Sequence, residues 1–505
     1  MADVLSKQDV QDVLDVIKQL YLEDRIPWIC GYSGGKDSTA IVQLVWMALR
    51  QIPKEKRVKT VHVISTDTMV ESPVVAVWSS QSLKKMAEAA AAEDLPIIPH
   101  RLTPEIRNTY WVQVIGRGYP YPRQNFRWCT DRMKIAPANN FIKEILDAES
   151  EAIMVLGSRK AESATRKAVL EGYEKKRYRA HLSPNGSFPN SYVFTPIENW
   201  TNDNVWQFLV QYENPWGHSN KELMAMYSGA SADGECPMVI DTSTPSCGNS
   251  RFGCWICTLV TEDKSMNAMI KNDEEKAWML PLLEFRNYIA SMDDHSVDRN
   301  RRDFRRMTGK LTWHNGRLVH GPYTKEVRED FLRKLLKLDI LIHEIGPEEI
   351  KDVPLITMEE LRMIRKLWLD EKREFDDSLP RIYEEVTGKP FVDPAIKTNK
   401  YYGKAEWDLL GEVCRELYPD EQLLPEMQAR LLDVEAKSST MIRRRNIKKS
   451  IEDEIKYCYY KDEEDAVEMA RLRRKRIGQD DDVDEDDGDG EITVDAEKQM
   501  LEEAL

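Results

Sequence analysis

A glycine-rich loop near the N-terminus has the residue types that can hold a phosphate group. It reads YSGGKDS over residues 32–38, after a short apolar run expected to be a strand and before a segment with helical periodicity. In that setting the first N–H groups of the helix point at a bound anion, and glycine permits a backbone approach that a Cβ would block. Lys36 can neutralise phosphate and Asp37 can help to hold Mg²⁺. The pattern predicts a phosphate site that is not of the Walker A type, with an ordinary glycine turn as the alternative.

Polar residues also follow two other apolar runs that are expected to be strands. Ligands of open α/β sheets bind outside the carboxyl ends of the strands, so Asp67 is expected beside the nucleotide. Arg159 and Arg166 can grip an α-phosphate through paired N–H groups, or can form the solvated basic start of a helix. The residues expected to bind the nucleotide are Ser33, Gly34, Gly35, Lys36, Asp37, Ser38, Asp67 and Arg159. The residues expected to act on the transferred phosphate are Lys36, Asp37, Arg159 and Arg166.

A parallel sheet with helices on both faces is expected to position these loops. Strands are predicted at 28–32, 58–65, 95–100 and 152–156, and helices at 1–21, 38–49, 74–92 and 138–146. Strands that alternate with helices are typical of α/β proteins with a parallel sheet. The polar stretch 172–191 is predicted to be a mobile loop, and the chain beyond about 330 is predicted to be mainly helical. No apolar run approaches the length of a membrane span and no signal peptide is recognisable, so a cytoplasmic location is expected.

The phosphate loop resembles the SGGxDS signature of the PP-loop ATP pyrophosphatases. This resemblance implies cleavage of ATP between the α and β phosphates, which yields pyrophosphate and an adenylated substrate. The segment RWCTDRMK at 127–134, with further matches between 196 and 206, resembles the PAPS-reductase-like branch of the class, which handles sulfur. The likeness covers roughly residues 25–216.

Four of the eight cysteines lie within 22 residues and are the expected metal ligands: Cys236, Cys247, Cys254 and Cys257. A large chain in a reducing compartment should not depend on disulfides, so metal binding is the favoured explanation of the cluster. Four thiolates suit either zinc or a [4Fe–4S] cluster. Only one C-x₂-C pair is present and the spacing is uneven, which favours iron and sulfur over zinc. Buried free thiols are the remaining alternative.

The sequence GECPMVIDTSTPSCGNSRFGCWICT, taken with the phosphate loop, is similar to the DndC family. The resemblance implies DNA phosphorothioation, in which sulfur replaces a non-bridging oxygen of the DNA backbone. It also implies a [4Fe–4S] cluster, ATP and Mg²⁺ as cofactors, and a cysteine desulfurase and other Dnd proteins as partners. Cys129 is the expected sulfur carrier, because Arg127 and Lys134 nearby could lower its pKa. The alternative is that Cys129 is a packing residue.

Acidic residues are concentrated at the end of the chain. Of the net charge of −15, residues 480–505 carry 13 acidic residues and one lysine. DNA contact would use basic stretches at 175–177, 299–306 and 443–449, each of which can equally be a solvated helix face. The expected divisions are 1–235 (PP-loop domain), 236–330 (iron–sulfur and basic segment), 331–478 (helical region) and 479–505 (disordered acidic tail).

Three other functions compete with DNA phosphorothioation. A PAPS-type reductase is expected to use a cysteine near its C-terminus, and the last cysteine here is Cys458. A tRNA thiolase would share the phosphate loop and a cluster but would modify a base. A DNA-binding scaffold would use nucleotide and cluster only for structure. Pyrophosphate release with DNA, with tRNA and without an acceptor would separate these possibilities.

Overall fold

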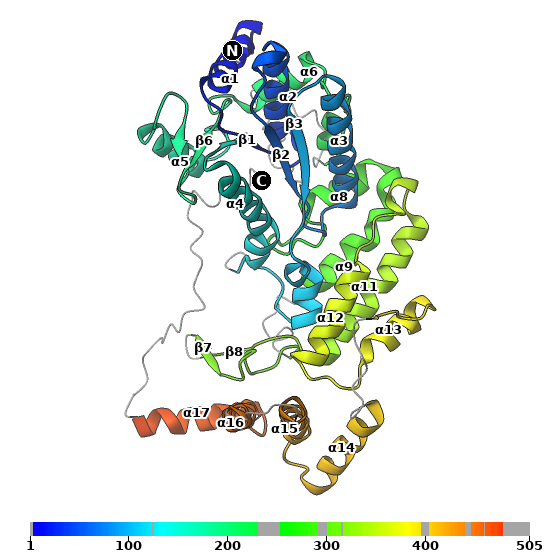
Figure 1. Ribbon diagram of the computed structural model, residues 1–505. Helices are drawn as coiled ribbons and strands as arrows, with labels where there is room; N and C mark the ends of the chain where they lie inside the picture. Colours follow the sequence, from blue (N-terminus) through cyan, green and yellow to red (C-terminus); the bar gives the residue numbers. More distant parts are fainter. Residues whose placement is uncertain are drawn as a thin grey trace.

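The N-terminal part of the chain forms a mostly parallel six-stranded sheet. The computed structural model describes residues 4–123, 126–230, 253–290, 300–314, 317–394, 403–439, 446–458 and 460–477. In spatial order the strands are β3 (Ile97–Leu102), β2 (Val61–Thr66), β1 (Trp28–Gly31), β4 (Ala152–Val155), β6 (Ser191–Phe194) and β5 (Ser183–Pro184). Strand β1 pairs in parallel with both β2 and β4, and only β5 is antiparallel to its neighbour. The predicted α/β class with a parallel sheet is therefore confirmed (Figure 1).

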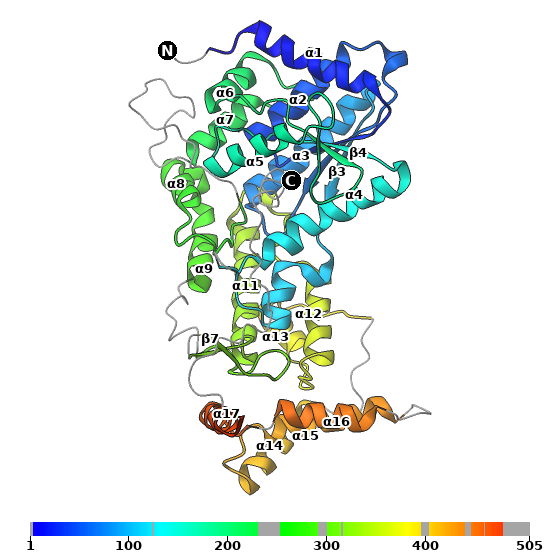
Figure 2. The same ribbon diagram turned by 90° about the vertical axis from the view of Figure 1, so that its left-hand side faces the viewer.

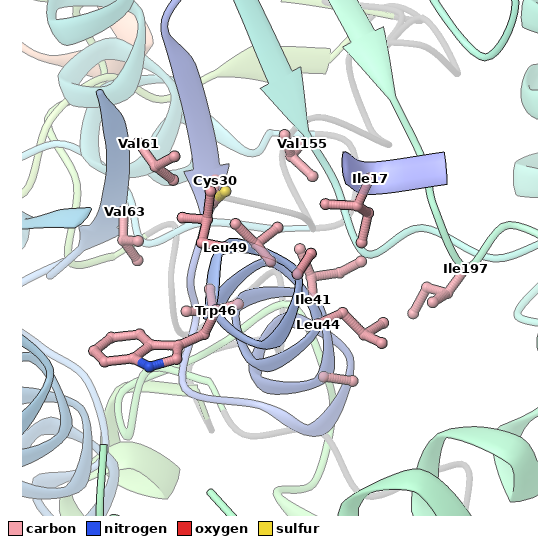
Figure 3. Packing of buried hydrophobic residues seen from close by; sticks show 14 of the residues in the cluster. Ile17, Cys30, Ile41, Leu44, Trp46, Leu49, Val61, Val63, Val155 and Ile197 are labelled. Atoms are coloured by element: carbon pink, nitrogen blue, oxygen red, sulfur yellow. The ribbon is translucent and has the colours of Figure 1, made fainter. Parts of the chain in front are cut away.

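Helices cover both faces of this sheet, because successive strand side chains point to opposite sides. Cys30 contributes to the core on one face and its neighbour Ile29 to the core on the other. The first face packs against α1 (Lys7–Glu23), α2 (Lys36–Arg50), α3 (Pro73–Ala92), α6 (Asn202–Gln211) and α7 (Asn220–Gly229). The second face packs against α4 (Ala136–Glu149) and α5 (Ala164–Lys175). Figure 3 shows the first core, where Cys30, Val61, Val63 and Val155 lie beside Ile41, Leu44, Trp46 and Leu49 of α2.

A second core joins the sheet half of the chain to the helical half. The π-helix η3 (Val112–Arg117) packs against α12 (Met358–Asp370), and at Gly116 a Cβ would come within 2.9 Å of Leu367. The indole N–H of Trp368 donates to the carbonyl of Ile115 at 2.9 Å. The other elements here are η2 (Ile106–Asn108), η4 (Thr130–Ile135), α8 (Lys264–Asn272), η5 (Glu274–Met279), α9 (Leu280–Ala290), α11 (Lys325–Ile345), η7 (Glu348–Ile350) and α13 (Ser378–Thr387). Residues 109–135 thus link the two halves (Figure 2).

The last helices lie at the end of the molecule away from the sheet (Figures 1 and 2). They are α14 (Lys404–Leu417), α15 (Leu424–Ser438), α16 (Ile447–Tyr457) and α17 (Glu463–Ile477), beside the hairpin of β7 (Thr312–His314) and β8 (Arg317–Val319). Arg305 is 3% exposed and its guanidinium lies 3.0 Å from Glu426 and 2.8 Å from Asp303. A buried ion network therefore holds these helices to the rest of the chain.

The prediction of a loop over 172–191 is confirmed for residues 176–182 and 185–190 and is wrong for the rest. The rest contains the end of α5, all of β5 and the first residue of β6. Strand β6 continues the parallel sheet beside β4, and Val193 of this strand is buried. Three of the four residues of β6, Tyr192, Val193 and Phe194, favour strands, but the run is short and directly follows a polar stretch. None of the helices in the described parts is both long enough and apolar enough to cross a membrane.

Candidate nucleotide and thiol site

The phosphate loop connects β1 to α2, and hydrogen bonds of its own serines fix its conformation. Gly34 has a φ of +73°, a left-handed conformation that favours glycine over residues with a side chain. The Ser33 N–H donates to Ser38 Oγ at 3.2 Å, and Ser38 Oγ donates to the carbonyl of Gly35 at 3.0 Å. The indole N–H of Trp78, on α3, donates to the carbonyl of Gly34 at 3.3 Å. These three hydrogen bonds therefore fix the turn at the N-terminus of α2, the part of a helix where anions bind.

Asp37 lies in the first turn of α2 between two cations. The Lys36 Nζ is 2.9 Å from one carboxylate oxygen, and the Arg159 Nε donates to the other at 2.8 Å. Burial favours the neutral acid, but the charges of Lys36 and Arg159 outweigh burial and lower the pKa of Asp37 below its usual value. At Gly157 a Cβ would lie 3.1 Å from the Asp37 carbonyl oxygen. The loops after β1 and β4 thus meet where the strand order reverses, the usual ligand position in such sheets.

The two arginines predicted beside the phosphate differ in their surroundings. Arg159 is 2% exposed and also donates to the carbonyl of Trp200 at 3.4 Å, so its guanidinium is fixed at Asp37. Arg166 forms an ion pair with Glu162, which itself faces Arg159 at 3.6 Å. The structure therefore brings Arg159 to the phosphate loop, whereas it brings Arg166 to Glu162.

Asp67 directly follows β2, as expected, and borders a small hollow. Arg101 on β3 donates to Asp67 through its Nε at 3.0 Å. The hollow is narrow, with room for about 10 Å³, and is lined by Ser65, Asp67, Glu71, Ala76, Ser79, Ser80, Leu83 and Arg101. Burial raises the pKa of Glu71 to about 7, the nearby Lys134 only partly opposing it. Neither Glu71 nor Arg101 was expected at this site from the sequence, although Glu71 stands only four positions after Asp67.

Tyr227 of α7 reaches the phosphate loop from the other side. Its hydroxyl accepts from the backbone N–H of Lys36 at 3.4 Å, and its ring lies 5.6 Å from the Lys36 Nζ. A Cβ at Gly35 would come within 3.0 Å of the hydroxyl. The hydroxyl of Tyr227 therefore borders the phosphate loop, although no local sequence motif predicts this.

A backbone pairing brings the segment of Cys254 and Cys257 to the residues that follow β2. Glu71 and Cys254 form an antiparallel bridge, and the Trp255 N–H donates to the carbonyl of Val70 at 3.0 Å. The hydroxyl of Thr68 lies 3.3 Å from the Cys254 sulfur. Trp255 is 1% exposed within the second core, which anchors the segment. The residues that follow β2 therefore contact both the hollow beside Asp67 and the thiols.

Cys129 lies in the same region, at the start of η4. Its thiol interacts electrostatically with Cys257, and the ammonium of Lys134 interacts with the thiols of Cys254, Cys129 and Cys257. Burial raises the pKa of Cys129 to about 11, and Lys134 only partly opposes this rise. The expectation that neighbouring cations lower the pKa of Cys129 was therefore wrong, because desolvation of the thiolate is the larger effect.

Two of the four predicted metal ligands belong to the described part of the chain. Cys254 and Cys257 are described, whereas Cys236 and Cys247 lie outside the described residues. Within the described ranges no three His, Cys, Asp or Glu side chains are grouped so that they could hold a metal ion. Cys30 is fully buried in β1, and Cys414 and Cys458 are buried in the C-terminal helices.

The basic stretch at 299–306 is one of the expected DNA contacts, but two of its arginines form contacts within the protein. Arg305 is buried in the ion network with Asp303 and Glu426. Arg302 donates to the carbonyls of Gly321 and His320. At 175–177, Arg177 pairs with Glu198 at 2.8 Å. The residues 443–445 lie outside the described part of the chain.

Comparison with known proteins identifies the domain that contains the phosphate loop. Residues 27–259 match the family profile of the phosphoadenosine phosphosulfate reductase domain. The chain thus contains a PAPS reductase-like domain of the PP-loop superfamily, and the expected likeness to the PAPS-reductase-like branch of that class is confirmed. Uncharacterized protein MJ0066 of Methanocaldococcus jannaschii is 25% identical over 272 residues, covering 53% of this chain and 43% of that protein. The chain spans less than half the length of this relative.

Two solved structures share a distant likeness. FMN adenylyltransferase of Candida glabrata, in complex with FAD and inorganic pyrophosphate, is 12% identical with a TM-score of 0.26, covering 48% of this chain and 74% of its own. The U34-tRNA thiolase NcsA of Methanococcus maripaludis, with its [4Fe-4S] cluster, is 13% identical with a TM-score of 0.27, covering 58% and 81%. At these TM-scores neither structure carries weight for the function of this chain.

Proposed function

We propose that this chain transfers sulfur to the backbone of DNA in an ATP-dependent reaction that releases pyrophosphate. The observation that carries the proposal is the pairing of Glu71 with Cys254, which places a cysteine segment beside the residues that follow β2. A phosphate loop and thiols on one connected site suit a reaction that activates an oxygen and then replaces it by sulfur. The PAPS reductase-like domain supports sulfur chemistry in general. The choice of DNA rests on the likeness to the DndC family.

The first step activates the DNA phosphate. A non-bridging oxygen of the backbone attacks the α-phosphorus of ATP, the bond from this phosphorus to the oxygen bridging to the β-phosphate breaks, and pyrophosphate leaves. Lys36 and Arg159, whose charges meet at Asp37, would stabilise the negative charge that moves onto the phosphates. Asp37 fits Mg²⁺, because it is an ionised carboxylate at the phosphate loop. When bound, Mg²⁺ would neutralise phosphate charge.

The second step exchanges oxygen for sulfur. The terminal sulfur of a cysteine persulfide, loaded by a cysteine desulfurase, attacks the adenylated phosphorus, a P–S bond forms, and AMP leaves with its oxygen. A cellular thiolate then attacks the inner sulfur of the persulfide. The S–S bond breaks, the phosphorothioate is released, and a mixed disulfide remains on the carrier cysteine, which a second cellular thiol reduces.

We further propose that Cys236, Cys247, Cys254 and Cys257 supply the four ligands of a [4Fe–4S] cluster. Support comes from the donor types, because four thiolates suit such a cluster. When bound, the cluster would supply iron that accepts thiolate ligands. Cys129, which lies outside this set, is then the carrier of the persulfide.

The test is pyrophosphate release by the purified chain with ATP, Mg²⁺ and, in separate reactions, DNA, tRNA or no acceptor. The proposal expects release to be stimulated by DNA. Stimulation by tRNA alone would favour a thiolase, and release that ignores both polymers would favour a small-molecule acceptor. Absence of release from a chain that still binds ATP would favour the scaffold.

A further inference from the structure

We propose that Tyr119, Phe126 and Arg132 form a stacking platform that binds an unpaired base of single-stranded DNA next to Cys129. The inference rests on the proposed function and deepens it, because it names the part of the surface that receives the nucleic acid. The three residues belong to the segment that links the sheet to the helical half (Figure 2).

In the platform, the ring of Tyr119 lies beside both Arg132 and Phe126, and Phe126 is exposed. The rings of Tyr119 and Phe126 are nearly parallel, with 6° between their planes and 6.2 Å between their centroids. The guanidinium of Arg132 lies 4.7 Å from the centroid of Tyr119 and also donates to the Tyr119 hydroxyl at 3.3 Å. Arg132 is itself held by Gln113 at 2.5 Å. The platform is therefore braced from the buried side.

Phe126 is the exposed member of an otherwise buried aromatic group. Its side chain is 41% exposed, whereas the exposed fraction is 5% or less for the neighbouring aromatic residues Tyr110, Trp111, Tyr121 and Trp128. Its backbone is fixed, because Phe126 and Arg123 exchange two hydrogen bonds at 2.9 and 3.2 Å. A rigidly mounted aromatic ring that faces water contributes little to the core and is the type of residue on which bases stack.

The charge around the platform matches a nucleic acid. Residues 123–132 contain three arginines and one acidic residue, Asp131. Arginines beside aromatic rings bind the backbone and the base faces of single strands. A base within a duplex is already stacked, so the platform fits a single strand or an extruded base better than a closed duplex.

The position of the platform connects it to the thiols. Phe126 stands three residues before Cys129, and the intervening Trp128 donates to the carbonyl of Pro120 at 3.0 Å. The hydroxyl of Thr258, next to Cys257, donates to the carbonyl of Pro122 at 2.7 Å. A strand whose base stacks on Phe126 would therefore run past the cysteines that the sulfur step needs.

The test is fluorescence anisotropy with labelled single-stranded DNA, duplex DNA of the same sequence, and single-stranded RNA. We expect the wild-type protein to prefer single-stranded DNA, Phe126→Leu to weaken that binding roughly tenfold or more, and Phe126→Tyr to retain it. Tyr418→Leu, which removes an aromatic ring that is 57% exposed on the C-terminal side, should change nothing. ATP affinity should be unchanged in all three variants, which also reports that they fold.

The outcomes separate this inference from the proposed function. If DNA stimulates pyrophosphate release but Phe126→Leu binds DNA like the wild type, the platform is wrong and the function stands. If Phe126 governs binding of RNA while DNA is not bound, both assignments of DNA fall. A wild-type protein that binds no nucleic acid overturns both proposals.

Discussion

Arg159 and Asp37 stand 122 positions apart in the chain and form an ion pair at 2.8 Å that joins the loops after β4 and β1. The pair fixes a buried guanidinium at the N-terminus of α2, next to Lys36. The charges of Lys36, Asp37 and Arg159 are therefore in place before any phosphate binds. Groups arranged in advance can stabilise a transition state without the cost of rearrangement.

Replacing Asp37 by alanine should abolish this arrangement. The ammonium of Lys36 and the guanidinium of Arg159 would lose their shared partner, and a ligand for Mg²⁺ would be lost. Pyrophosphate release should fall roughly 100- to 1,000-fold, as when other charge-stabilising groups are removed from active sites. Asp147→Ala on the exposed side of α4 is the matched control and should keep full activity. Normal turnover by Asp37→Ala would show that the site lies elsewhere.

The hydroxyl of Tyr227 should contribute to nucleotide binding. It contacts the Lys36 N–H, one of the amides expected to hold phosphate, so it is placed to donate to a phosphate oxygen there. Hydrogen bonds to charged groups contribute about 1.5–3 kcal/mol, so Tyr227→Phe should bind ATP roughly tenfold more weakly or worse. Calorimetric titration with ATP measures this loss, with Tyr212→Phe as the control. Equal or tighter binding by Tyr227→Phe would exclude the contact.

Iron content identifies the cluster ligands. The wild-type protein purified without oxygen should contain about four iron atoms per chain, as a [4Fe–4S] site requires. Serine in place of Cys236, Cys247, Cys254 or Cys257 should lower the iron content. Cys129→Ser should keep its iron and fail to carry persulfide, which mass spectrometry detects. Loss of iron in Cys129→Ser would make this residue a ligand instead of the carrier, and one tightly bound zinc would replace the cluster altogether.

Arg305 should matter for stability more than for DNA. Its guanidinium is buried against Asp303 and Glu426, and removal of one partner from a buried pair commonly costs about 3–5 kcal/mol. Arg305→Met should therefore lower the unfolding temperature and loosen the C-terminal helices. The exposed Lys448, 3.9 Å from Glu452, offers a control in Lys448→Met that should leave stability unchanged. An Arg305→Met protein with unaltered melting and weakened DNA binding would contradict the structural role.

The sheet and the phosphate loop were predictable because their causes are local. The apolar runs of β1, β2 and β4 predict strands, and the glycines at 34 and 35 predict a tight turn after β1. Arg159 was also predictable, since a polar residue after a strand of a parallel sheet points at the ligand side. Strand β6 was not, because its four residues, SYVF, form too short a run to stand out after the polar stretch before them.

The surroundings of Cys129 and Cys254 could not be predicted from local sequence. The approach of Cys254 to Glu71 depends on a backbone bridge across more than 180 residues, and no spacing rule predicts it. The pKa of Cys129 was misjudged because the sequence shows neighbouring cations but not the burial that outweighs them. Tyr227 and Phe126 lie on segments without motifs, so only their surroundings in the fold give them a role.

The most direct measurement of the central claim is sulfur in the DNA of cells that carry this gene together with its partners. Nuclease digestion followed by mass spectrometry of the dinucleotides separates phosphorothioate linkages from ordinary ones. The account predicts phosphorothioate dinucleotides with the wild-type gene and none with Asp37→Ala. Sulfur on tRNA bases instead of DNA, or DNA sulfur that persists in the Asp37→Ala strain, would contradict it.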